Sequence, residues 1–268
     1  MASCPYCRYE KLQNDPAQCT KCDAKLNTVD GAWWRMMERY NYKVQFSGYA
    51  NAANHSGWPR GLTVGDRATT MAFVASFRAG HAEPKPSIET YLTVMYWRMS
   101  IQSGTVNSRT DALAVHLQTD LDVKLVRLKS AIDAFLAGDL PTPESATSLI
   151  HACGFNENVI AAAFAYPAFA DPLRYPMIDN RVAGWVNGRL DSPHASSLSR
   201  SPRKCKLAQF ARNNTSLRMN DSGAYLAWVL WCRETAAHLA QKQPLIGWTA
   251  WDVERAVFQN QQLSLPPL

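Results

Sequence analysis

The chain has 268 residues, of which 47% are hydrophobic and 19% charged, and its net charge is +6 at pH 7. This length is enough for a sizeable core in one or two domains. No apolar run approaches the ~18 residues of a membrane-spanning helix, and the first residues lack the apolar stretch of a signal peptide. We therefore expect a cytoplasmic protein without a membrane partner, and the basic charge favours a polyanionic partner.

Four of the seven cysteines lie near the start of the chain, in two Cys-x-x-Cys pairs that are eleven residues apart: Cys4, Cys7, Cys19 and Cys22. Two such pairs bring four thiolates to the spacing of a tetrahedral zinc site. We predict one structural Zn²⁺ in a module over residues 1–26, which are too few to form a core of their own. Four thiolates leave no open coordination position, so this zinc is not expected to be catalytic.

Residues 27–62 are rich in aromatic side chains, and residues 51–61, rich in Asn, Gly and His, are predicted as a loop. Aromatic residues interleaved with Arg and Lys either stack on bases or dock a small module on a larger domain. We favour docking and interpret 27–62 as a linker or docking segment.

From residue 63 to residue 268 the sequence predicts a helical domain, because apolar residues recur at helical spacing and alternating β-branched runs are scarce. The predicted fold class is all-α with a small N-terminal zinc module. Helices are expected over 64–78, 87–99, 110–117, 121–136, from 144 to a turn at Gly154, from that turn to Tyr166, from Asp179 to about Arg189, over 224–240, and after a cap at Thr249. The six histidines have no ligand spacing and are interpreted as surface or capping residues.

Residues 191–222 are polar and are expected to form a long loop or short helices. Their basic residues form either a phosphate-contact patch or a solvated loop. These residues are Arg200, Arg203, Lys204, Lys206 and Arg212.

The strongest candidate for chemistry lies in the run Met177-Ile178-Asp179-Asn180-Arg181-Val182, about two dozen residues after the Gly154 turn. It places one carboxylate at the start of a helix, behind an apolar run and beside a basic residue. Backbone N–H groups at a helix start hold such a carboxylate and also attract phosphate. Asp179 is therefore a candidate catalytic residue, and a simple helix cap is the alternative.

The stretch from Leu149 to Arg189 resembles the catalytic core of the helix-hairpin-helix DNA glycosylase superfamily, and the likeness extends over roughly residues 64 to 260. It implies that Asp179 stabilises the positive charge on the sugar as the base leaves. It also implies that Gln102, in Ser100-Ile101-Gln102-Ser103-Gly104-Thr105, fills the vacated base position. The hairpin departs from the family's Pro-Gly at His151 and Ala152, and keeps only the second glycine, Gly154.

Asn156 stands where bifunctional relatives carry a Schiff-base lysine, and an amide cannot form an imine. The resemblance therefore implies a monofunctional glycosylase that flips a base out of double-stranded DNA and leaves an abasic site. We expect a nucleoid-associated monomer. Contacts with DNA are expected from Gln102, Gly154, Asn156, Asn158, Arg181, Arg203 and Lys204.

Several alternatives stay open. The excised base is either a damaged base or a hypermodified one, such as a modified cytosine in phage DNA, which would give the protein a defence role. Basic residues around the cysteines leave open whether the zinc module touches DNA. The competing interpretations are a non-enzymatic zinc-containing DNA-binding protein and an interaction scaffold whose charge is incidental.

Overall fold

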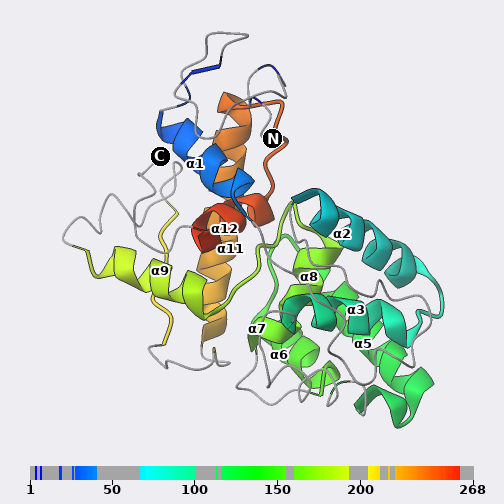
Figure 1. Cartoon of the computed structure of the whole chain (residues 1–268). Helices are drawn as coiled ribbons and strands as arrows, with labels where there is room; N and C mark the ends of the chain where they lie inside the picture. Colours follow the sequence, from blue (N-terminus) through cyan, green and yellow to red (C-terminus); the bar gives the residue numbers. More distant parts are fainter. Residues whose placement is uncertain are drawn as a thin grey trace. The chain divides into compact units, whose positions relative to one another are not determined.

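The computed structural model describes residues 4, 7, 18, 19, 26, 28–40, 67–99, 113, 116–154, 160–192, 205–211, 217 and 221–259. Every multi-residue element of regular structure in this part of the chain is a helix (Figure 1), which confirms the all-α expectation for it. Among the described helices, none combines the length and the apolar character that crossing a bilayer requires.

The chain forms two compact units. Unit 1 comprises residues 1–40, 172–215 and 223–268, and unit 2 comprises residues 41–171 and 216–222. Unit 1 is thus assembled from three separated stretches, whereas unit 2 is nearly continuous. The boundaries expected from the sequence, after residues 26 and 62, stay a prediction.

Unit 1 contains α1 (Val29–Glu38), α9 (Asn180–Leu190), α11 (Ser222–Lys242) and α12 (Ala250–Gln259). Helix α12 packs against both α1 and α9. Tryptophans from three of these helices meet in the core: Trp33 of α1 lies 5.9 Å from Trp231 of α11, and Trp185 of α9 lies 5.8 Å from the same ring. Trp228 stacks on Trp231 at 5.5 Å between ring centroids. Such large buried rings supply much of the apolar area that holds a unit of this size together.

Helix α1 was not predicted, because residues 27–62 were interpreted as a linker or docking segment. Thr28 caps the helix by accepting a hydrogen bond from the Gly31 N–H at 3.1 Å. Trp33, Trp34 and Met37 are buried on the face that packs into unit 1. In the described part of the segment the aromatic residues therefore serve packing within the unit.

Unit 2 contains α2 (Arg67–Ala82), α3 (Ile88–Met99), α5 (Leu121–Leu136), α6 (Pro143–Ala152), α7 (Ile160–Ala163) and α8 (Ala165–Ala170). Helix α8 lies against α2, α3 and α5, and α6 lies along α5 (Figure 1). Edge-to-face ring contacts join these helices, for example Phe77 with Phe169 at 6.0 Å and Tyr91 with Tyr166 at 5.9 Å.

The helix limits around the predicted hairpin need two corrections. Helix α6 begins at Pro143, one residue before the predicted start, because Thr142 and Ser145 form a capping box. Proline suits a first helical position, since its missing N–H has no intrahelical partner there. The following helix was expected to end before Pro167, but Pro167 lies in the first turn of α8, where it breaks no hydrogen bond.

Candidate functional site

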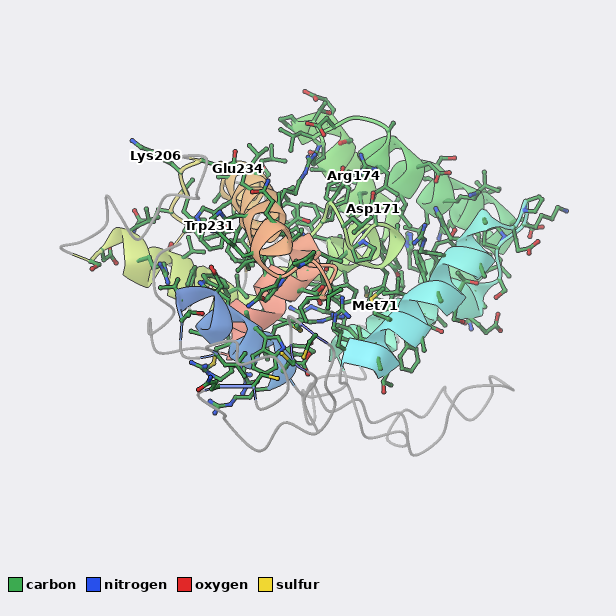
Figure 2. The ribbon with its side chains drawn as sticks, turned by 90° about the horizontal axis from the view of Figure 1, so that it is seen from above. Met71, Asp171, Arg174, Lys206, Trp231 and Glu234 are labelled. Atoms are coloured by element: carbon green, nitrogen blue, oxygen red, sulfur yellow. The ribbon has the colours of Figure 1, made fainter. Side chains whose placement is uncertain are left out.

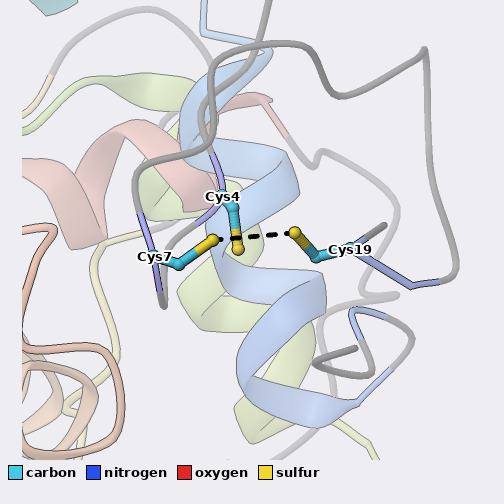
Figure 3. A group of neighbouring side chains, drawn as sticks. All are labelled: Cys4, Cys7 and Cys19. Atoms are coloured by element: carbon cyan, nitrogen blue, oxygen red, sulfur yellow. Dashed lines mark hydrogen bonds between the residues drawn. The ribbon is translucent and has the colours of Figure 1, made fainter. Parts of the chain in front are cut away.

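Three of the four predicted zinc ligands lie together (Figure 3). The sulfur atoms of Cys4, Cys7 and Cys19 are all within 4.8 Å of one another, and Cys7 Sγ is 3.7 Å from Cys19 Sγ. Four thiolates at ~2.3 Å from a zinc ion define a tetrahedron with edges of about 3.8 Å. The spacing of Cys7 and Cys19 therefore fits two corners of such a site. Cys22 lies outside the described residues.

The chain that leaves the cysteine cluster is fastened to α1. Leu26 is buried, and its carbonyl accepts a hydrogen bond from the Arg35 guanidinium. A side chain on Gly31 would collide with the same carbonyl, so the close approach of the two segments requires glycine. The cysteine cluster is thereby connected to the core of unit 1.

A strap of five residues, Arg174 to Ile178, carries Asp179 to the start of α9. Tyr175, Met177 and Ile178 are buried, and Pro176 between them is buried as well. Two side chains of α11 hold the strap's backbone: the Tyr225 hydroxyl donates to the Pro176 carbonyl at 3.2 Å, and Trp228 Nε1 donates to the Met177 carbonyl at 3.0 Å. Because the strap is packed and hydrogen-bonded, it fixes the position of Asp179.

The two residues that precede the strap, Pro172 and Leu173, are held by backbone hydrogen bonds. The N–H groups of Ala250 and Trp251, at the start of α12, donate to the carbonyls of Leu173 and Pro172 at 3.3 and 3.2 Å. Helix α12 itself begins with the predicted cap: Asp252 N–H donates to Thr249 Oγ1 at 3.0 Å. The strap and the two residues before it are therefore held by helices α11 and α12 of unit 1.

Asp179 caps α9 with one of its two carboxylate oxygens. Its backbone is extended, and Oδ1 accepts a hydrogen bond from the Val182 N–H at 2.8 Å. The side chain is half-buried. Among the described residues no further hydrogen bond to this carboxylate is formed. Asp179 thus performs the capping role of the alternative interpretation and still presents Oδ2.

Arg181, in the first turn of α9, is exposed and lies over the ring of Phe258 at 5.0 Å. This cation–π contact holds the guanidinium near the end of α12 and two residues from Asp179. The start of α9 therefore combines a helix N-terminus, a carboxylate and a guanidinium. The helix N-terminus and the guanidinium can attract an anion, and the carboxylate can stabilise a positive charge.

The hairpin glycine has an internal role in unit 2. Gly154 has a φ of +68°, and a side chain there would collide with the imidazole of His116. Burial and the nearby Lys124 lower the pKa of His116, and the backbone of Ala152 offsets part of that shift. The turn therefore needs glycine both for its left-handed backbone and for the His116 ring.

Most of the other predicted DNA contacts lie outside the described residues. These are Gln102, Asn156, Asn158, Arg203 and Lys204. Gly154 belongs to unit 2, whereas Asp179 and Arg181 belong to unit 1.

The sequence interpretation of His81 as a surface or capping residue is wrong. His81 is buried, with Nδ1 3.3 Å from the Tyr91 hydroxyl and Nε2 3.0 Å from Asp133 Oδ1. Burial lowers its pKa more than the Asp133 hydrogen bond raises it. Tyr91 has no exposed surface, so its hydroxyl is not an accessible nucleophile. The contacts among His81, Tyr91 and Asp133 instead join α2, α3 and α5. Its partners are ten and 52 residues away along the chain, a separation that leaves no local sequence signal.

Comparison of the chain with protein-family models, with curated proteins and with solved structures gives no match.

Proposed function

We propose that the protein is a monofunctional DNA glycosylase that hydrolyses the bond between a modified base and its sugar. The observation that supports this most is the position of Asp179: a half-buried carboxylate, fixed by a packed strap at a helix start, with one oxygen not used by the cap. The likeness of the segment to the helix-hairpin-helix glycosylases supplies the reaction class.

In this proposal Asp179 acts electrostatically. Departure of the base leaves positive charge on the sugar, and a fixed carboxylate stabilises that charge and orients the attacking water. The Val182 N–H holds Oδ1, so that Oδ2 faces the reacting sugar without a change of side-chain conformation. Arg181 contacts the phosphate on one side of the flipped nucleotide.

The product is expected to be an abasic site and not a strand break. The chain has no lysine between Lys129 and Lys204, so neither the hairpin nor the Asp179 segment contains an amine for a Schiff base. The cysteine cluster is proposed to hold one structural Zn²⁺ through Cys4, Cys7, Cys19 and Cys22. That zinc folds its module and takes no part in base release.

A second candidate, a non-enzymatic zinc-containing DNA-binding protein, is favoured by one observation. The hydrogen bond that Asp179 accepts from the Val182 N–H is what an ordinary N-cap forms. In that case DNA is bound but no base is released.

The deciding experiment incubates the purified protein with duplexes that carry damaged or hypermodified bases, followed by alkali to cleave abasic sites. We expect cleavage only after alkali, no borohydride-trapped adduct, and no cleavage with Asp179→Asn. Efficient trapping would overturn the monofunctional assignment. DNA binding without base release from the whole substrate panel would favour the second candidate.

A further inference from the structure

One face of α12 carries a row of charged and aromatic side chains that ends at the start of α9. Asp252, Arg255 and Phe258 follow one another at intervals of three residues, so they lie on the same face of the helix. Arg255 has no exposed surface, and its Nη1 donates to Asp252 Oδ1 at 2.8 Å. Its guanidinium also lies over the Trp251 ring at 4.6 Å from the centroid. Arg255 is therefore fixed inside unit 1 and serves packing within it.

Tyr40 connects α1 to this row. It directly follows the C-cap of α1, and its N–H donates to the Met37 carbonyl at 3.1 Å. The Tyr40 ring is only 4% exposed and lies 5.5 Å from the Arg255 guanidinium. The same ring meets Phe258 edge to face, with 5.8 Å between the centroids. Two views show α12 beside both α1 and α9 (Figure 1, Figure 2). Tyr40 therefore supports the Phe258 ring from the side of α1.

Phe258 in turn contacts Arg181, in the first turn of α9. The ring is half-buried, and the exposed Arg181 guanidinium lies over it at 5.0 Å. Among the described residues, none forms a hydrogen bond or an ion pair with Arg181. Contact with the face of a ring uses none of the five N–H donors of a guanidinium. Arg181 is therefore held in place while its donors stay available to a ligand.

We propose that Phe258 and Tyr40 are positioning residues for the phosphate contact of Arg181. An arginine that is free in solution loses the freedom of several torsions when it binds a phosphate, and that loss lowers the affinity. Stacking on Phe258 restricts these torsions before the ligand arrives. Neither ring contacts the substrate, so both act through Arg181. The inference rests on the proposed function for the identity of the ligand, a phosphate beside the flipped nucleotide.

The first test observes Arg181 in the full-length protein without DNA. A proton above an aromatic ring resonates upfield, so the Arg181 Nε–Hε signal, assigned by its loss in Arg181→Gln, should be shifted upfield in wild type. Phe258→Trp should keep an upfield shift, because it keeps a ring. Phe258→Leu keeps an apolar side chain without a ring, and should return the signal to the position of an unstructured arginine. A wild-type signal that already has this position would overturn the proposal.

The second test measures affinity for a fluorescein-labelled duplex that carries a tetrahydrofuran abasic-site analogue, which resembles the expected product and cannot be hydrolysed. Arg181→Gln is expected to weaken binding roughly tenfold or more, since it removes a charged hydrogen bond. Phe258→Leu and Tyr40→Leu are expected to weaken binding about two- to fivefold, the value of an exposed cation–π contact.

Two controls accompany these variants. Tyr40→Phe keeps the ring and should bind as wild type does. Lys242→Gln removes the same charge as Arg181→Gln from an exposed site at the end of α11, and should also bind as wild type does. An equal loss in Lys242→Gln and Arg181→Gln would show that net charge alone drives binding, and would overturn the proposal.

A double-mutant cycle decides whether Phe258 acts through Arg181. Phe258→Leu should weaken binding in wild type and have no further effect in Arg181→Gln. Additive losses would show that Phe258 supports the fold and not Arg181, and would overturn the proposal. On a duplex from which a base is released, Phe258→Leu should raise KM and leave kcat near the wild-type value, whereas Asp179→Asn lowers kcat.

The cycle is measured by binding and does not require base release, so the two proposals fail separately. Coupling between Phe258 and Arg181 without base release from any duplex would overturn the glycosylase and support the positioned phosphate contact. Base release without such coupling would overturn the positioning role and support the glycosylase.

Discussion

The two compact units differ in the structural roles of the residues that the sequence predicted to be functional. Unit 2 contains the hairpin glycine, Gly154, and the His116 ring fills the space that a side chain at Gly154 would take. Unit 1 contains Asp179, whose carboxylate caps α9 with one oxygen. Unit 1 also contains the cysteine cluster.

Gly154 and Asp179 differ in whether their structural role explains the residue type. A left-handed backbone and a packed imidazole together account for glycine at position 154. Capping does not account for aspartate at position 179, because Asn and Ser cap helices about as well. Asp179 is therefore the stronger candidate for chemistry, and each unit can be perturbed separately to test the contrast.

Removal of zinc is expected to have the largest effect, and only in unit 1. Structural zinc sites contribute roughly 10 kcal/mol or more to the folding of their modules. Chelation, or Cys19→Ser, should abolish hydrogen-exchange protection around the cysteine cluster and in the first turn of α1, which Leu26 contacts. Cys205→Ser is the matched control and should keep one zinc per chain by metal analysis. Equal loss of protection in α2 and α5 of unit 2 would remove the contrast between the units.

Gly154→Ala is expected to produce the largest loss in unit 2. The left-handed backbone costs alanine ~1–2 kcal/mol, and the collision with His116 adds about 1–3 kcal/mol of overpacking. The midpoint of urea unfolding measures the change. Gly184→Ala on α9 is the control and should stabilise by up to ~1 kcal/mol, because outside the helix's own neighbouring backbone nothing lies within 4 Å of the added carbon.

Adding His116→Ala to Gly154→Ala should recover the part of the loss that comes from the collision. The two substitutions are therefore expected to be non-additive. Additive losses would show that His116 does not explain the glycine, and would return Gly154 to the status of a candidate phosphate contact.

Local sequence signals predicted the elements whose determinants are local. The predicted helix over 121–136 coincides with α5, and Thr249 caps α12 as expected, because capping and the helical period act within a few residues. Cys-x-x-Cys spacing predicted the grouping of Cys4 and Cys7 for the same reason. The cap position of Asp179 was likewise predicted as an alternative to catalysis.

Contacts between distant segments could not be predicted in this way. The ring of His116 reaches Gly154 from another part of the chain, and Tyr225 and Trp228 hold a strap that lies about fifty residues earlier. Helix α1 was missed because its aromatic residues suit a docking surface as well as a helix. Tertiary packing decides whether such an aromatic segment forms a helix, and the local sequence pattern does not predict that packing.

Substitutions at Asp179 are expected to separate capping from chemistry in unit 1. Asp179→Ala should lower the free energy of unfolding by ~1 kcal/mol, whereas Asp179→Asn and Asp179→Ser should change it by less than about 0.5 kcal/mol. All three should lose base release, because none keeps the carboxylate. Thr28→Ala, which removes the cap of α1, is the control: stability should fall by ~1 kcal/mol while base release is retained. Base release by Asp179→Ser at the wild-type rate would reduce Asp179 to a cap.

The smallest effect is a pH dependence of stability that belongs to unit 2. Burial lowers the pKa of His81 below its ordinary value of 6.5, so the unfolded chain binds the proton more readily than the folded chain. The groups that face the ring are the Tyr91 hydroxyl of α3 and, from α5, the Asp133 carboxylate and the nearby Lys129 ammonium.

With Nε2–H donating to Asp133 and Tyr91 donating to Nδ1, the neutral ring satisfies both neighbours. A second ring proton would leave the buried Tyr91 hydroxyl hydrogen without this acceptor. The contribution of His81 to stability is therefore complete above pH 6.5 and is lost as the pH falls from 6.5 towards the folded-state pKa, with a slope of at most ~1.4 kcal/mol per pH unit. Urea unfolding at pH 7.5 and 5.5 should show this loss in wild type and in the exposed-site control His151→Gln, but not in His81→Gln. If the stability of His81→Gln shows the same pH dependence, the cause lies outside the His81 hydrogen bonds. The pH dependence would then not distinguish unit 2 from unit 1.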